Sequence, residues 1–133
     1  MSNIQTVQSI YAAFGRGDVP TILGHLHENI DWDYGLADAG VPWIRPRKSH
    51  EEVAMFFQSL QALDFTSFQV KTFLESGNVV VVLLDVGFIV KSTGLAITEE
   101  DEVHIWHFDD QGLITRFTHR VDTHKHWAAL QGK

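Results

Sequence analysis

The chain has 133 residues and is expected to form one domain spanning residues 1–133, because this length supports one sizeable core but not two. Its 17 acidic and 10 basic residues give a net charge of -7, which disfavours nucleic acid and anionic membrane surfaces as partners. With no cysteine, the chain can form neither disulfides nor thiolate metal sites. The N-terminus lacks the basic flank and apolar core of a signal peptide, so we expect a cytoplasmic protein.

The first half of the chain has the patterns of helices. Apolar residues at helical spacing predict a first helix that ends at Gly15. Asp18 is a candidate N-cap for a second, shorter helix that carries apolar residues as far as Leu26. The Gly- and Pro-containing segment 31–46 has no helical period and predicts a short strand followed by a long loop. Ser49 and Glu52 have capping-box spacing and predict the start of a third helix.

After Asp64 the apolar period changes from helical to alternating, which predicts strands. Four strands are expected, at 65–75, 78–91, 96–108 and 112–121. The order of helices followed by an antiparallel meander is typical of an α+β fold with helices against one side of a bent sheet. The long strands have no polar face, so the side without helices is expected to meet a second copy of the chain.

The last hairpin concentrates candidate functional residues. The turn residues 109–112 predict a four-residue loop that sets Phe108 opposite Leu113. Because side chains alternate along a strand, one face of this hairpin is predicted to carry two histidines and several apolar side chains. They are His104, Trp106, Phe117, His119 and Val121. Two imidazoles on one wall could reach the same small ligand, although each alone could equally be a buried histidine bonded to a neighbour such as Glu102 or Tyr11.

Three other features have competing interpretations. Asp122 precedes the sequence THKHWAAL, which is typical of a short helix, so we interpret it as an N-cap rather than a catalytic acid. Asp85 is a lone acid in an apolar strand and is expected at a bulge or in a pair across a dimer. The eight histidines lack the spacing of a zinc signature, so no metal site is predicted.

Aromatic residues are frequent and are expected to line or close a cavity, although some could belong only to the core. The candidates are Trp32, Trp43, Phe57, Phe88, Trp106 and Phe117. Aromatic walls with few polar groups favour a flat, hydrophobic organic ligand over a sugar or a free nucleotide.

Several local motifs, in this order along the chain, are similar to those of a known family. They are YAAFGRGD at 11–18, Trp32, the helix SHEEVAMFF, and HFDDQGLITRF followed by VD. The chain resembles the SnoaL-like branch of the NTF2-like superfamily, which includes ketosteroid isomerases, polyketide cyclases, dehydratases and non-catalytic binding domains. The resemblance implies a cone-shaped α+β barrel, in which a curved, mostly antiparallel sheet is wrapped by three N-terminal helices around a deep apolar pocket, with dimerisation through the outer sheet face.

The resemblance also suggests where an active site would lie. The positions that match the family's catalytic groups hold His104 on the penultimate strand, His119 on the last strand, and Tyr34 beside Asp33. Histidines there predict cofactor-free acid/base chemistry on an enolisable carbonyl compound, with Tyr34 or Tyr11 as a hydrogen-bond donor and Val121 among the ligand contacts. The alternative is a binding or dimerisation module that has the same pocket and no chemistry.

Overall fold

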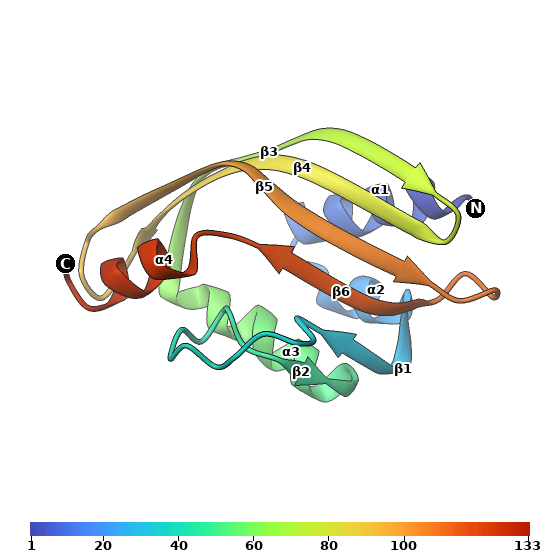
Figure 1. Cartoon of the computed structure of the whole chain (residues 1–133), viewed down its shortest axis with the longest axis horizontal. Helices are drawn as coiled ribbons and strands as arrows, with labels where there is room; N and C mark the ends of the chain where they lie inside the picture. Colours follow the sequence, from blue (N-terminus) through green and yellow to red (C-terminus); the bar gives the residue numbers. More distant parts are fainter.

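A curved six-stranded sheet forms one side of the molecule in the computed structural model, which describes residues 1–133 (Figure 1). The helices and strands follow one another as α1 (Asn3–Gly15), α2 (Val19–Gly24), β1 (Leu26–Trp32), β2 (Arg47–Lys48), α3 (Ser49–Ser59), a 3-10 turn η1 (Leu60–Ala62), β3 (Leu63–Ser76), β4 (Val79–Val90), β5 (Ala96–Phe108), β6 (Ile114–Arg120) and α4 (Thr123–Leu130). The predicted α+β fold, with its curved and mostly antiparallel sheet, is confirmed.

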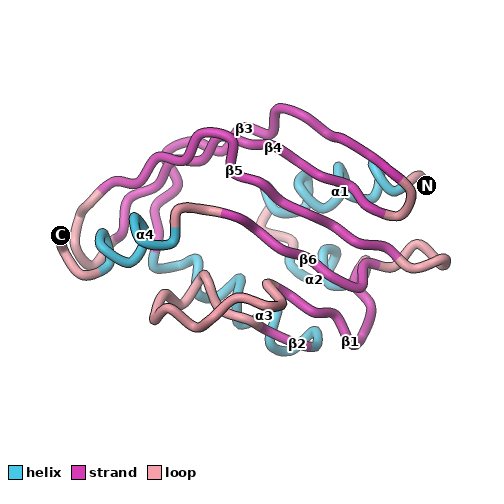
Figure 2. Tube along the Cα trace, viewed as in Figure 1, coloured by secondary structure: helices cyan, strands magenta, loops and turns pink.

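The strand order is β2-β1-β6-β5-β4-β3, and only the pairing of β1 with β6 is parallel. Helices α1, α2 and α3 lie on one side of the sheet, and α4 lies near the connection of β4 to β5 (Figures 1 and 2). The Thr93 hydroxyl in that connection donates to the Ala129 carbonyl of α4 at 2.8 Å. The C-terminal helix is therefore attached to the end of the sheet at which β4 connects to β5.

Local signals explain where the helices begin. Ser2 and Gln5 form a reciprocal capping box at the start of α1. Asp18 caps α2, and Asp122 caps α4 by accepting from the Lys125 backbone N–H, as predicted for both aspartates. The second helix is shorter than expected: Leu26 begins β1 rather than ending α2, because the chain leaves the helix after Gly24 to pair with β6.

The alternation in the long strands divides their side chains between two faces. In β4, Val80, Val82 and Leu84 are fully buried against the helices, whereas Val81 and Leu83 between them are only half-buried on the outer face. A bulge lies between Leu84 and Val86, where one was expected. Asp85 lies at this bulge, which is the first of its two expected settings, and it pairs with Lys71 of the same chain at 2.9 Å.

The last hairpin has a different register from the predicted one. Phe108 pairs with Ile114 rather than Leu113, and an irregularity next to His107 shifts the remaining pairs, so that His104 lies directly opposite His119 and Trp106 opposite Phe117. The total shift is even, so the predicted common face of these residues is preserved.

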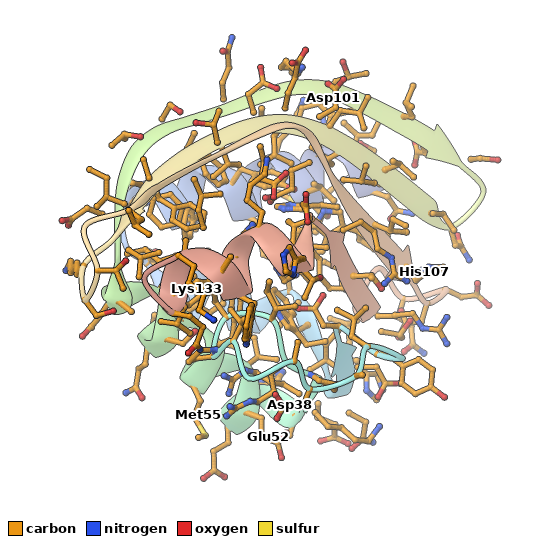
Figure 3. All side chains as sticks on the ribbon, turned by 60° about the vertical axis from the view of Figure 1, so that its left-hand side comes forward. Asp38, Glu52, Met55, Asp101, His107 and Lys133 are labelled. Carbon is orange, nitrogen blue, oxygen red and sulfur yellow. The ribbon has the colours of Figure 1, made fainter.

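No helix is both long enough and apolar enough to cross a membrane. On the sheet, Asp101 and His107 point away from the interior, which is filled with side chains (Figure 3).

Candidate functional site

An apolar cavity of about 90 Å³ lies between the helices and the inner face of the sheet. Thirteen of its 17 lining residues are hydrophobic. The other four are Glu102, His104, His119 and His126, so three imidazoles and one carboxylate line the cavity in addition to the hydroxyl of Tyr11. Such a concave, mostly apolar site with a few convergent polar groups is typical of small-molecule binding.

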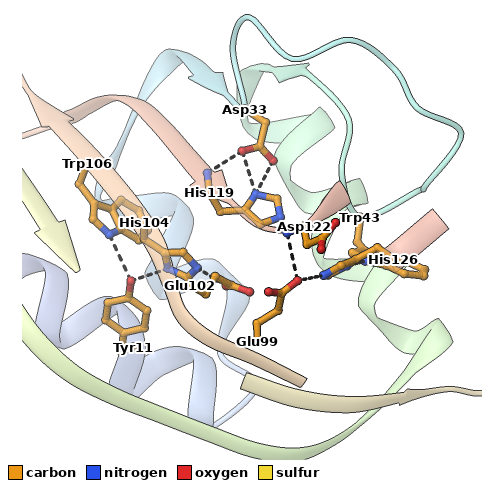
Figure 4. A network of polar contacts seen from close by, with 10 residues as sticks. All are labelled: Tyr11, Asp33, Trp43, Glu99, Glu102, His104, Trp106, His119, Asp122 and His126. Atoms are coloured by element: carbon orange, nitrogen blue, oxygen red, sulfur yellow. Dashed lines mark hydrogen bonds and ion pairs between the residues drawn. The ribbon is translucent and has the colours of Figure 1, made fainter. Parts of the chain in front are cut away.

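His119 reaches this cavity from β6 and is held from behind by a carboxylate that follows β1. Its Nδ1 lies 2.8 Å from Oδ1 and 2.7 Å from Oδ2 of Asp33, and its backbone N–H also donates to Oδ1 at 2.8 Å (Figure 4). Since an ionised carboxylate only accepts, Nδ1 carries a proton. The other ring nitrogen, Nε2, has no partner in the protein and keeps access to open space. His119 therefore presents one free nitrogen to the cavity.

The position of Asp33 follows from the parallel pairing of two distant strands. Its side chain is fully buried, its backbone N–H donates to the Phe117 carbonyl at 2.7 Å, and its φ of 56° lies in the left-handed region. Aspartate is one of the few side chains that tolerates this conformation. The backbone turn after Trp32 aims the carboxylate at β6 instead of along β1.

Electrostatics favour protonation of His119. Burial alone would lower the pKa of its imidazole, but the charge and the hydrogen bond of Asp33, with a further contribution from Glu102, raise the pKa above its ordinary value. The Asp33–His119 pair is therefore an oriented acid/base group that can hold or release a proton at Nε2.

His104 differs because both of its ring nitrogens are occupied. The Trp106 indole N–H donates to the Tyr11 hydroxyl at 3.3 Å, and that hydroxyl lies 2.6 Å from Nδ1 of His104. Burial raises the pKa of Tyr11 far above its ordinary value, so the hydroxyl keeps its proton and donates to Nδ1. Nε2 must then carry the imidazole proton, which it donates to Glu102 Oε2 at 2.7 Å (Figure 4).

The hydrogen bonds from Trp106 through Tyr11 and His104 to Glu102 all run in one direction, and the shifted pKa values agree with this direction. Burial lowers the pKa of His104 despite the nearby carboxylate, so the ring is neutral. Burial would raise the pKa of Glu102, but the hydrogen bond that His104 donates, together with the favourable electrostatic contribution of the surrounding imidazoles, outweighs it, so this pKa is lowered and the carboxylate is ionised. Glu102 Oε1 has no protein partner and is not sealed off from open space.

A third polar group ties α4 to the long loop before β2. The Trp43 indole N–H donates to His126 Nδ1 at 2.9 Å, and His126 Nε2 donates to Glu99 Oε1 at 2.9 Å. The same oxygen accepts from the Asp122 backbone N–H at 3.1 Å. Burial lowers the pKa of His126 despite Glu99, so this ring is also a neutral donor.

The predicted site residues fall into two groups. The residues that line the cavity include His104, His119, Tyr11, Trp32, Trp43, Phe88 and Phe117. Those that do not are Tyr34, Phe57, Trp106 and Val121. Trp106 does not line the cavity but donates a hydrogen bond to Tyr11, which does. Phe57 lines an adjoining surface groove.

Tyr34, which was predicted to be catalytic, lies outside the cavity. Its side chain is 57% exposed, and the Arg116 guanidinium lies 5.0 Å from the centre of its ring. The expectation that Tyr34 is a catalytic group therefore has no support in this arrangement, because Tyr34 is exposed whereas Asp33 beside it is fully buried and bonded to His119.

The site also contains Asp33, Glu99, Glu102 and His126, which were not among the expected site residues. Alternation from His104 could have found Glu102, because residues two apart share a face. Asp33 had no comparable signal, since its contact with His119 spans 86 positions. No three histidine, aspartate or glutamate side chains are arranged to hold a metal ion.

Known protein structures share this fold over the whole chain. An NTF2-like protein of unknown function from Burkholderia pseudomallei K96243 is 27% identical, with a TM-score of 0.83 and 98% coverage of both chains. TerC, co-crystallised with polyporic acid, is 23% identical, with a TM-score of 0.80 and coverage of 97% of this chain and 98% of TerC. A candidate polyketide cyclase from Xanthomonas campestris pv. campestris is 21% identical, with a TM-score of 0.71 and 96% coverage of both chains.

The last two similarities are below 25% identity and bear on the fold alone. No curated protein matches the chain. The model of the SnoaL-like domain family matches residues 7–117, which include most of α1, all of α2 and α3, and most of the sheet. The resemblance expected from the local motifs is thereby confirmed, and the chain belongs to the SnoaL-like domain family.

Proposed function

We propose that the chain binds a small, hydrophobic organic molecule in the cavity and catalyses cofactor-free proton transfer on an enolisable carbonyl compound. The observation that carries this proposal is the Asp33–His119 pair, which leaves Nε2 of a buried histidine free toward an apolar space. In its neutral form, Nε2 removes a proton from the carbon next to the carbonyl group. In its protonated form, it returns the proton to another atom of the ligand.

The remaining polar groups supply orientation and a neutral donor. Tyr11 lines the cavity, keeps its proton, and can turn its O–H from His104 toward a ligand oxygen. A donor at that oxygen stabilises the negative charge that develops as the enolate forms. His104 holds both Tyr11 and Glu102 in place, so we assign it a positioning role beside the proton exchange at His119.

The size of the cavity limits the ligand to about one ring. A dry apolar cavity of about 150 Å³ can take benzene, and the volume here is about 90 Å³, so a ring enters only if lining side chains move apart. The co-crystal of TerC with polyporic acid supports the idea that this fold accepts organic ligands.

The test is the exchange of the α-protons of cyclohexanone in heavy water, followed by proton NMR. The wild-type chain is expected to accelerate exchange over buffer, and His119→Ala to lose roughly 10²-fold or more of that acceleration, because general-base catalysis contributes about 10²–10⁴-fold. His124→Ala, an exposed histidine on α4, is the matched control and should keep the wild-type rate.

Exchange at the wild-type rate in His119→Ala would remove the catalytic assignment. A wild-type chain that shifts its amide resonances with cyclohexanone but gives no acceleration would instead be the non-catalytic binding module.

We also propose a homodimer formed through the outer sheet face. This face carries a continuous apolar patch at its centre, composed of Leu74, Val79, Val81, Leu83, Val103 and Ile105, none of which is fully buried. Ile105→Glu would place a charge in the middle of the patch and should convert a dimer to a monomer in light scattering coupled to gel filtration. A wild-type chain that is monomeric at micromolar concentration would exclude this dimer.

A further inference from the structure

The cavity contains one polar atom that can only accept a hydrogen bond, the free carboxylate oxygen of Glu102. Of its four polar lining residues, His104 has both ring nitrogens engaged by Tyr11 and Glu102. His126 is likewise engaged on both sides, by Trp43 and Glu99. With the Tyr11 hydroxyl bonded to His104, the polar atoms that have no protein partner are Glu102 Oε1, a fixed acceptor, and His119 Nε2, which accepts when the ring is neutral and donates when it is protonated.

The charge around these atoms is mostly negative. No lysine or arginine lines the cavity, whereas Glu102 does so directly. Asp33 and Glu99 lie just behind the wall, bonded to His119 and His126. Lys125 approaches Glu99 only to 3.9 Å and from a side chain that is 45% exposed, so it does little to offset the buried charge. A carboxylate or phosphate entering the cavity would be desolvated next to Glu102 without a cationic side chain to accept it, except the histidine that Asp33 already neutralises.

Glu102 Oε1 also needs a partner once water leaves. A charged oxygen that is buried by a bound ligand loses its water and incurs a large desolvation cost unless the ligand donates to it. Its other oxygen is already committed to His104 at 2.7 Å. A purely apolar ligand therefore leaves this oxygen unsatisfied, and a hydroxylated ligand does not.

From this geometry we infer that the cavity selects uncharged ligands that carry a hydroxyl group, which donates to Glu102 Oε1, and that it rejects carboxylates of the same size. This inference rests on the proposed function and narrows its substrate class to hydroxylated carbonyl compounds. In such a compound the hydroxyl lies at Glu102 and the proton to be transferred lies at His119.

Three probes of about one ring separate the relevant properties at pH 7. Phenol is a neutral donor, toluene has nearly the same shape without a donor, and benzoate is an anion. Binding is measured by titrating each probe and following the amide resonances of the cavity-lining residues by NMR. In a cavity that recognises only apolar surface, toluene would bind more tightly than phenol, since it is the more hydrophobic of the two.

For the wild-type chain we expect the opposite order, with phenol bound roughly tenfold or more tightly than toluene and benzoate bound most weakly, because a hydrogen bond to a charged acceptor contributes a factor of about 10 to 100. In Glu102→Gln, the amide oxygen is needed by the His104 N–H, so the amide NH2 faces the cavity in place of the acceptor. This variant should bind toluene more tightly than phenol and should gain affinity for benzoate.

Glu100→Gln is the matched control. It removes the same charge from the neighbouring part of β5 but from an exposed side chain, and it should keep the wild-type order. Toluene binding as tightly as phenol to the wild-type chain overturns the inference while leaving an apolar binding pocket intact. A preference for benzoate also overturns it. Failure of all three probes to bind overturns both this inference and the proposed function, and the wild-type ranking decides the question even if Glu102→Gln does not fold.

Discussion

Replacing Asp33 with asparagine tests the pair that carries the proposed chemistry. Asparagine has nearly the same shape, tolerates the left-handed backbone at φ 56°, and keeps an oxygen for the His119 backbone N–H. It lacks the charge that stabilises the protonated imidazole. The fully buried position of Asp33 leaves no water to replace that charge.

The magnitude follows from the bonds that change. A hydrogen bond between ionised partners contributes about 1.5–3 kcal/mol, and removing one member of a buried ion pair costs about 3–5 kcal/mol when the other stays charged. His119 can lose its proton in the variant, which avoids the larger cost, so we expect Asp33→Asn to lower the free energy of unfolding by about 2 kcal/mol at pH 6. The pKa of His119 should fall below its ordinary value, because burial then acts with less opposition.

The pH dependence of this loss is the sharper test. The pKa of His119 is raised in the folded wild-type chain, so its stabilising contribution is complete below the unfolded pKa of about 6.5 and is lost as pH rises through the higher folded pKa. The difference between wild type and Asp33→Asn should therefore shrink from pH 6 to pH 9. Urea unfolding at several pH values, with NMR titration of the His119 ring, measures both effects. A difference that is constant across this range, or an unchanged His119 pKa in the variant, would refute the reasoning.

Three further predictions concern the neutral histidines and their donors. Tyr11→Phe leaves the Trp106 N–H and the unprotonated nitrogen of His104 without their partner, so thermal and urea unfolding should report a loss of about 1–3 kcal/mol, and a change within error would argue against the assigned chain of donors. Trp43→Phe removes the only donor to His126 Nδ1 and should raise the solvent exchange of amides in α4; unaltered protection there would contradict the link between the loop and the helix. The lowered pKa values of His104 and His126 stabilise the fold above the unfolded pKa of about 6.5, and this stability is lost as pH falls toward the folded values, so the melting temperature should drop from pH 7 to pH 5 and would fail to do so if these rings were charged at neutral pH.

The fold and the wall of the cavity could be predicted from the sequence because they depend on period and order. The alternation in β5 and β6 fixes which side chains share a face, and this survived an error in the register because the shift was even. The helix starts were found where a capping aspartate stands before an apolar stripe, as at Asp18 and Asp122.

The partners of the histidines could not be predicted in the same way. Asp33 meets His119 only because β1 runs parallel to β6, a pairing between distant segments that no local pattern encodes. The resemblance to the ketosteroid isomerases points to Tyr34, its neighbour in sequence, because that position matches their general base. The structure instead buries Asp33, in a left-handed turn, beside His119 and leaves Tyr34 exposed.

The hydrogen bonds from Trp106 through Tyr11 and His104 to Glu102 allow only one placement of their protons, because an indole N–H can only donate and an ionised carboxylate can only accept. If one member were replaced by a residue with the opposite donor or acceptor role, two neighbouring groups would both be donors or both be acceptors. Anyone who wishes to redesign this pocket for a different substrate must therefore exchange whole sets of residues together, and natural divergence of the site is expected to proceed by compensated pairs of substitutions.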